Sequence, residues 1–283
     1  MVERRGRGGW LPYAVLLAGS AVFAFPIYVA VIASTHDVGT IGRGNLPLTP
    51  GGFALENYQQ AWMRGTGQRV RGTPVWQMMA NSLIMAMVIT VGKIAVSMLS
   101  AYAVVFFRFR LRMFFFWLIF LTLMLPVEVR IIPTYKVLSD LGMVNTFAGL
   151  TVPLMASATA TLLFRQFFLT IPDELVEAAK IDGAGPLRFL RSVVVPLSRT
   201  NIAALCVILF IYGWNQYLWP LLITTSRGMD TVVIGITKMI GTGDALIDWN
   251  LIMATTVLAL VPPVAVVVLM QRWFVRGLIE TEK

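Results

Sequence analysis

VWQMMANSLIMAMVITVGKIAVSMLSAYAVVFF, residues 75–107, contains a single charged side chain, Lys93. A helix rises about 1.5 Å per residue and the hydrocarbon core of a bilayer is about 30 Å thick, so about 20 apolar residues cross it. The stretch is longer than this and lacks the alternation of a barrel strand, and its helical backbone would satisfy its own hydrogen bonds in lipid. It therefore predicts a membrane-spanning helix.

Similar apolar stretches recur along the chain. The weakest lies at residues 113–132, where the uncharged part ends at Val127, before Glu128 and Arg130. The sequence predicts an all-α, polytopic membrane protein that forms one transmembrane domain over residues 1–283. The six predicted spans cover about residues 11–33, 75–107, 113–132, 145–164, 200–226 and 249–271.

The overall composition supports a lipid environment. Of the 283 residues, 57% are hydrophobic and 13% charged, and the mean hydropathy is +0.76. Soluble domains carry about 25% charged residues, so this chain has too few to cover a water-soluble surface. With one cysteine, Cys206, and one histidine, His36, the sequence predicts no disulfide framework and no metal site.

The net charge of +9 has a topological explanation. The N-terminus, the second and fourth loops and the C-terminal tail carry 14 of the 23 Lys and Arg residues, the opposite side carries 8, and Lys93 is the remaining one. Because positive residues accumulate in cytoplasmic loops, both termini are expected in the cytoplasm of a multi-pass protein of a bacterial inner membrane. No nucleic-acid partner is needed to explain the charge.

The first span could be mistaken for a secretory signal peptide, since it follows three arginines and ends in Val31-Ile32-Ala33. Its apolar core exceeds the roughly 7 to 15 residues of a signal peptide, and five further spans follow. We expect a retained anchor.

The fourth loop, residues 170–197, is predicted to be structured. Thr170 followed by Asp173 resembles a capping box, and Gly183 is a natural helix stop after mostly helix-forming residues. Pro186 can open a second short helix, and Pro196 interrupts the chain before the fifth span. A helix of about 11 residues is marginal alone, so it must dock onto a partner or rest on the membrane surface.

Glu177-Ala178-Ala179, the spaced Gly183, and Val193, Val195 and Pro196 together resemble the EAA loop of ABC importer permeases. The match departs from the family pattern only in having valine at both aliphatic positions. The resemblance implies the type I ABC importer transmembrane fold and a cytoplasmic loop that couples to a nucleotide-binding subunit. The coupling residues expected from it are Glu174, Glu177, Ala178, Ala179, Asp182, Gly183 and Pro196.

Other segments extend the resemblance to the carbohydrate-type branch of this family, most closely to permeases for sn-glycerol-3-phosphate. They are residues 123–130, 156–168, 171–182, 212–222 and 270–278. The resemblance implies import of sn-glycerol-3-phosphate or glycerophosphodiesters through half of a heterodimeric pore. The implied partners are a homologous second permease, two nucleotide-binding subunits and a periplasmic solute-binding protein, besides membrane lipid.

The chain itself shows no catalytic pattern. It has no phosphate-binding loop of the form G-x-x-x-x-G-K-[ST], no carboxylate dyad and no nucleophile paired with a base. We expect a non-catalytic subunit without a cofactor, with ATP and Mg²⁺ bound by partner subunits.

Candidate residues for the solute path lie in three of the predicted spans. Trp214, Asn215, Gln216 and Tyr217 combine amides with rings, and either contact the solute or form part of an aromatic belt. Lys93 and Arg130 are the other candidates.

An intramembrane charge such as Lys93 is often functional, although a lysine can also extend to the interface. Arg130 either pairs with Glu128 or controls the access of an anion.

Three alternatives remain open from the sequence. The same architecture could import a sugar or an oligosaccharide. A secondary transporter would need buried acids, and none of the six spans has one near its middle. A non-transporting membrane scaffold would have no use for the docking loop.

Overall fold

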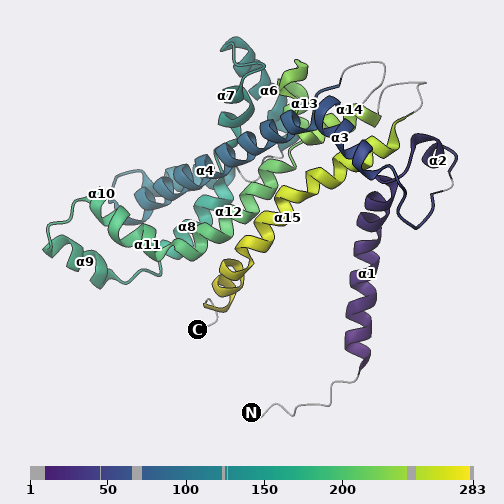
Figure 1. Ribbon diagram of the computed structural model, residues 1–283. Coiled ribbons are helices and arrows are strands. Elements are labelled where there is room, and N and C mark those ends of the chain that lie inside the picture. The colour runs from purple at the N-terminus through teal and green to yellow at the C-terminus, as the bar shows by residue number, and fades with distance from the viewer. Residues whose placement is uncertain are drawn as a thin grey trace. The chain divides into compact units, whose positions relative to one another are not determined.

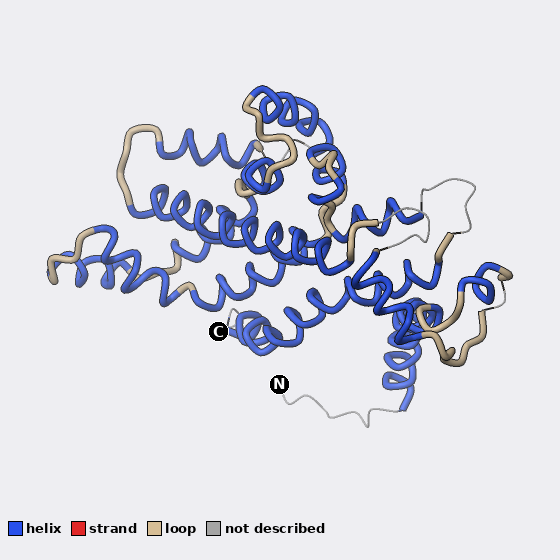
Figure 2. Tube along the Cα trace, turned by 45° about the horizontal axis from the view of Figure 1, so that its top comes forward, coloured by secondary structure: helices blue, strands red, loops and turns tan. Residues whose placement is uncertain are grey.

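The computed structural model describes residues 10–44, 46–65, 72–122, 125, 127–240 and 247–280, and only the backbone of residues 127, 128, 227 and 272–280. Within these residues every regular element is helical, as Figure 2 shows. The predicted all-α class is therefore confirmed for the described part of the chain. The principal helices are α1 (Trp10–Ala33), α3 (Ala54–Arg64), α4 (Val75–Phe106), α5 (Arg112–Leu121), α6 (Val127–Asp140), α8 (Ala158–Phe168), α9 (Asp173–Ile181), α12 (Arg199–Trp214), α14 (Val232–Ile240) and α15 (Trp249–Glu280).

Shorter elements connect these helices. They are α2 (Val38–Gly42), α7 (Phe147–Thr151), η1 (Val152–Leu154), α10 (Pro186–Phe189), η2 (Leu190–Val194), α11 (Val195–Leu197), α13 (Leu218–Ile223) and η3 (Arg227–Met229). The chain divides into two compact units, one formed by Met1–Gln77 with Gly235–Val261 and the other by Met78–Ile234 with Pro262–Lys283.

A buried amide network holds the first unit together. Asn57 on α3 donates from Nδ2 to the carbonyl oxygens of Ser34, at 2.9 Å, and His36, at 2.8 Å. Asn250 at the start of α15 donates to Oδ1 of Asn57 at 2.7 Å. Because buried amides need partners, this network fixes the loop after α1 against α3 and α15.

The second unit is built along α4. Figure 1 shows α6, α7 and α13 near one end of α4 and α9 and α10 at its other end. The first group shares a hydrophobic core in which Trp219 of α13 donates from Nε1 to the carbonyl oxygen of Gly149 at 3.1 Å. The core side chains are Met85, Ile89, Leu138, Leu150, Trp219 and Ile223.

Small residues bring α4 close to its neighbours. A Cβ added at Gly213 of α12 would lie 2.9 Å from the Cα of Ala86, so the backbones of α4 and α12 approach as closely as glycine permits. Ser97 on α4 is fully buried and donates to the carbonyl oxygen of Ser157 at 3.1 Å. Ser97 therefore packs directly against the backbone just before α8.

Three of the described helices are long and apolar enough to cross a membrane: Trp10–Ala33, Val75–Phe106 and Trp249–Gln271. Two bent pairs meet the same criterion, Phe147–Leu154 with Ala158–Phe168 at 47° and Pro186–Leu197 with Arg199–Trp214 at 74°. The remaining predicted span, residues 113–132, is not one helix, because α5 ends at Leu121 and α6 begins at Val127.

Local chemistry explains these interruptions. Leu125, the residue before Pro126, forms a bend, as the steric restriction ahead of proline favours. Ser157 caps α8 by accepting from the amide of Ala160, and so begins a new helix inside predicted span 145–164. Predicted span 200–226 likewise ends early, because α12 stops at Trp214 and the chain resumes as α13.

Candidate functional site

The predicted helix in the fourth loop forms as α9, although its predicted cap is wrong. The residue at the N-cap is Pro172, and the Thr170 hydroxyl donates backwards to the carbonyl oxygen of Phe167 at 2.7 Å. Asp173 and Glu174 lie in the first turn and Lys180 in the last. These charges complement the helix dipole and support a helix that has no side-chain cap.

Gly183 ends α9 in the way the sequence predicted. Its φ is +68°, and its amide bonds the carbonyl oxygen of Lys180 at 3.0 Å. The amide of Ala184 bonds the carbonyl oxygen of Ala179 at 2.9 Å, which completes a Schellman motif. Since L side chains avoid this φ, glycine permits the sharp reversal between α9 and α10.

The second short helix also begins where predicted, with Pro186 in its first turn. It continues through η2 and α11, which contains Pro196, and then turns by 74° into α12. Tyr102, near the C-terminal end of α4, donates from its hydroxyl to the carbonyl oxygen of Pro186 at 2.8 Å. This bond ties α10 to the end of α4.

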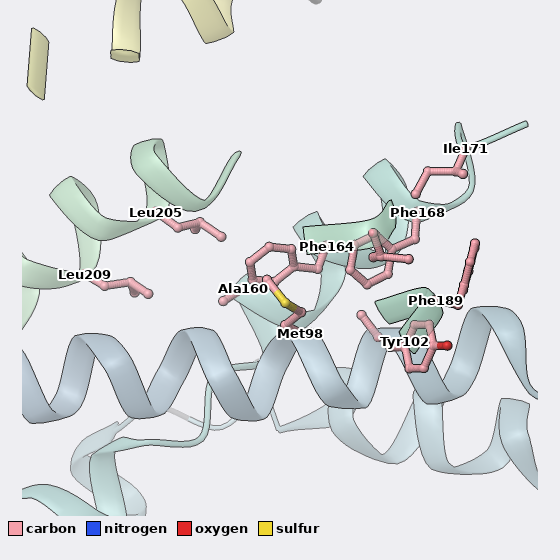
Figure 3. Close-up of a cluster of buried hydrophobic side chains, with 11 residues drawn as sticks. Met98, Tyr102, Ala160, Phe164, Phe168, Ile171, Phe189, Leu205 and Leu209 are labelled. Carbon is pink, nitrogen blue, oxygen red and sulfur yellow. The ribbon is translucent and has the colours of Figure 1, made fainter. Parts of the chain in front are cut away.

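A hydrophobic cluster anchors the loop, as Figure 3 shows. Phe189 of α10 lies beside Tyr102 of α4, with ring centroids 6.4 Å apart. Val176 and Ala179 on α9, three positions apart and so on one helix face, pack against the same cluster. Its buried members are Met98, Ala101, Tyr102, Ala160, Phe164, Phe168, Ile171, Phe189, Val194, Leu205 and Leu209.

The other face of α9 is exposed. The exposed predicted coupling residues are Glu174, Glu177, Ala178, Asp182 and Gly183, whereas Ala179 and Pro196 are half-buried.

Two large apolar side chains that are not among the predicted coupling residues are exposed beside them, Ile181 at 85% and Leu187 at 78%. Apolar residues flanking Gly183 would have been the signal for them. The short helices thus expose a mixed acidic and apolar surface, while the hydrophobic cluster holds their other side in place.

A second candidate site lies at Lys93. Its side chain is 6% exposed, and Nζ lies 3.7 Å from the centroid of the Tyr212 ring. A cavity of about 150 Å³ opens beside it, and Arg130 contributes to the same wall. The lining residues are Lys93, Arg130, Ile131, Thr134, Pro153, Leu154, Ala156, Tyr212 and Trp219.

The structure therefore brings together two of the residues predicted for the solute path. The other four do not line this cavity. Trp214 is buried and stacks on Phe210, with ring centroids 5.9 Å apart. Asn215 and Tyr217 are exposed, and Gln216 donates to the backbone carbonyl of Tyr212 at 3.2 Å.

Tyr212 and Trp219, which belong to the same aromatic segment as Trp214, do line the cavity. The suggested Glu128–Arg130 pair falls on a side chain, that of Glu128, outside the described residues. No group of three His, Cys, Asp or Glu side chains in the described ranges is arranged to hold a metal ion.

The sequence is similar to those of known transport proteins. Residues 93–280 match the family model described as "Binding-protein-dependent transport system inner membrane component". Similar proteins named "sn-glycerol-3-phosphate transport system permease protein UgpE" come from Brucella melitensis, Rhizobium meliloti and Salmonella typhi. Each is 58% identical over 283 residues, with full coverage of both chains.

The fold also resembles a solved structure, a bacterial ABC transporter involved in the import of the acidic polysaccharide alginate. The TM-score is 0.81 at 22% sequence identity, and the match covers 97% of this chain and 99% of the other. The arrangement of helices is therefore that of a type I ABC importer permease. The chain belongs to the family of inner membrane components of binding-protein-dependent transport systems.

Proposed function

We propose that this chain is a permease subunit of an ABC importer for sn-glycerol-3-phosphate and glycerophosphodiesters. The observation that carries the proposal is 58% identity, without a length difference, to permeases named for sn-glycerol-3-phosphate transport. The cavity that holds Lys93 and Arg130 supports an anionic solute, since a cationic wall attracts anions.

The proposed subunit forms half of the pore and pairs with a homologous second permease. Two nucleotide-binding subunits bind and hydrolyse ATP with Mg²⁺, and a periplasmic binding protein delivers the solute. In this arrangement α9 and α10 transmit motion. Glu177 and Ile181 are exposed on α9, and the other face of this helix packs on a cluster that includes α4 residues, so a partner that moves α9 also moves α4.

We infer six spans in a bacterial inner membrane, with both termini in the cytoplasm. The three long helices and the two bent pairs would supply five of these spans. Helices α5 and α6 together would supply the remaining one, which is the third span in chain order. The bond from Tyr102 to Pro186 supports this topology, because it joins the α4 end next to the second loop to the fourth loop. Both loops are predicted to lie on the same, cytoplasmic side.

Uptake into proteoliposomes tests the proposed solute. Vesicles containing both permeases and the nucleotide-binding subunits, with binding protein and ATP, should accumulate labelled sn-glycerol-3-phosphate. Omission of the binding protein should abolish uptake. Accumulation of maltose instead would indicate a sugar importer, and uptake without ATP would indicate a secondary transporter.

The coupling role needs its own measurement, the stimulation of ATPase activity by loaded binding protein. Glu177→Lys and Gly183→Val should each remove most of this stimulation. Asp140→Lys on α6 is a matched charge reversal at an exposed carboxylate whose ion pair with Lys136, at 3.4 Å, contributes little. It should behave as wild type. Full stimulation in both loop variants would refute the coupling role.

A further inference from the structure

The cavity beside Lys93 contains two cationic side chains and, among the described residues that line it, no acidic one. A water molecule needs roughly 10–15 Å³ of such space, so a cavity of about 150 Å³ has room for a small polar group with its hydration. All of its lining residues belong to the unit formed by Met78–Ile234 and Pro262–Lys283. The site therefore exists within one compact part of the chain.

Lys93 is incompletely satisfied by the protein. Among the described residues it forms no ion pair and no hydrogen bond, and its one polar contact is with the Tyr212 ring. An ammonium group has three hydrogen-bond donors, and a cation–π contact engages its charge without filling them. Charged side chains inside membrane spans commonly mark the pathway of a substrate or ion, so an anionic ligand fits the unfilled donors of Lys93.

Arg130 adds a second positive charge within electrostatic range of Lys93. Like charges at one site repel each other in a medium of low dielectric constant. The Thr134 hydroxyl, which donates to the backbone carbonyl of Arg130 at 2.7 Å, is neutral and so cannot cancel this repulsion. An anion that contacts both cations would offset their repulsion and would accept hydrogen bonds from their N–H groups.

The rest of the wall is largely apolar and held in place. Trp219 donates its only N–H to the carbonyl oxygen of Gly149, so its ring offers the cavity surface and no hydrogen bond. Ile131, Leu154 and Ala156 add aliphatic surface. This combination fits a small organic anion better than a hydrated inorganic ion.

We propose that Lys93 and Arg130 bind the phosphate group of the transported solute, with Tyr212 holding the Lys93 ammonium in place. The proposal rests on the proposed function, and it makes this permease a determinant of solute selection in addition to the binding protein. A phosphate monoester with two negative charges should depend on both cations more strongly than a diester with one.

The test uses the complete importer in phosphatidylcholine vesicles and compares Lys93→Met, Arg130→Met and Lys93→Arg. Methionine keeps most of the side-chain volume but removes the charge. Lys136→Met is the matched control, since Lys136 lies on the same helix as Arg130, is 77% exposed and is absent from the cavity wall. Copurification of all subunits checks that each variant assembles.

Each methionine variant should take up sn-glycerol-3-phosphate about tenfold more slowly or worse, as expected when a hydrogen-bonded charge is lost. Uptake of glycerophosphoethanol, a phosphodiester, should fall less. Lys93→Arg should retain most of the activity, and Lys136→Met should stay within about twofold of wild type. Stimulation of ATPase activity by loaded binding protein should persist in all assembled variants.

Three results would overturn the site. Wild-type uptake rates in both methionine variants would show that the two cations do not bind the solute. Equal losses of uptake for the monoester and the diester would show that the site does not distinguish phosphate charge. The third result is a Lys93→Met variant that no longer assembles, together with an assembled Arg130→Met variant whose preference for the monoester is unchanged. It would show that Lys93 pairs with the second permease and does not bind the solute.

A lipid phosphate is the other source of the same chemistry. If it occupied the site, wild-type uptake would depend on added phosphatidylglycerol and the variants would lose that dependence, which would also contradict the proposal. The proposed function fails separately, if wild type does not import sn-glycerol-3-phosphate at all.

Discussion

The approach of α12 to α4 at Gly213 allows a quantitative prediction for Gly213→Ala. The new Cβ would lie 2.9 Å from the Cα of Ala86, a backbone atom that cannot rotate away. Ordinary contacts begin at 3.4 Å, so an ordinary contact requires the two backbones to move apart by about 0.5 Å, which is 3.4 minus 2.9. Overpacking of this kind costs about 1–3 kcal/mol.

Alanine is also the better helix former, by about 0.5–1 kcal/mol, so the net loss should be on the order of 1–2 kcal/mol. That loss should lower the melting temperature of the purified complex by several degrees, at about 2–4 °C per kcal/mol. Tyr212 precedes Gly213, and its ring contacts Lys93 on α4 at 3.7 Å. Separation of the helices should therefore also reduce uptake of the solute.

The control is Gly19→Ala on α1, where an added Cβ meets nothing within 4 Å. It should leave the melting temperature unchanged or slightly raised. A Gly213→Ala complex that melts and transports like wild type would refute the reasoning, because it would show that the two helices can separate without cost.

Three further substitutions follow from the structure. Gly183→Ala places a side chain at φ +68° in open space, and the backbone strain of about 1–2 kcal/mol should lower the stimulation of ATPase activity. Gly185→Ala is the control, because Gly185 has a negative φ and equally open surroundings, and it should leave the stimulation unchanged. Tyr102→Phe removes the bond to Pro186, worth about 0.5–1.5 kcal/mol, and should speed amide exchange in α10 by up to about tenfold; unchanged exchange would contradict an anchoring role. Burial raises the pKa of Asp248, so the folded state holds the proton more tightly than the unfolded state does. The free energy of unfolding should therefore fall as the pH rises from the ordinary carboxyl pKa through the raised one. Asp248→Asn should flatten this pH dependence in thermal melts, and an unaltered slope would assign the dependence to other groups.

Much of the helical organisation was predictable, because lipid demands long apolar helices and these leave a plain signal. Predicted spans 11–33, 75–107 and 249–271 correspond to helices that the structure also contains. The predictions failed at the shorter stretches, such as 113–132, where hydropathy stays high across a break in the backbone. A hydropathy pattern reflects composition, so it does not reveal the bend at Leu125 or the helix cap at Ser157.

The loop after α8 shows how local and tertiary information divide. The sequence by itself determined that a short helix ends at Gly183 and that another begins at Pro186, because glycine and proline act through their own backbone restrictions. It could not show that Val176 and Ala179 face the core while Ile181 is exposed. That orientation depends on Phe189 and on partners from other helices.

The sequence established the helical class, and its motif resemblance gave the family that the comparisons confirm. It also placed Lys93 in a span and Arg130 at the end of another, 37 positions apart. Only the tertiary structure decided that both line one cavity with Tyr212 and Trp219. The physical reason is that hydrophobicity and backbone restriction act along the chain, whereas the meeting of two charges depends on how α4, α6 and α12 pack.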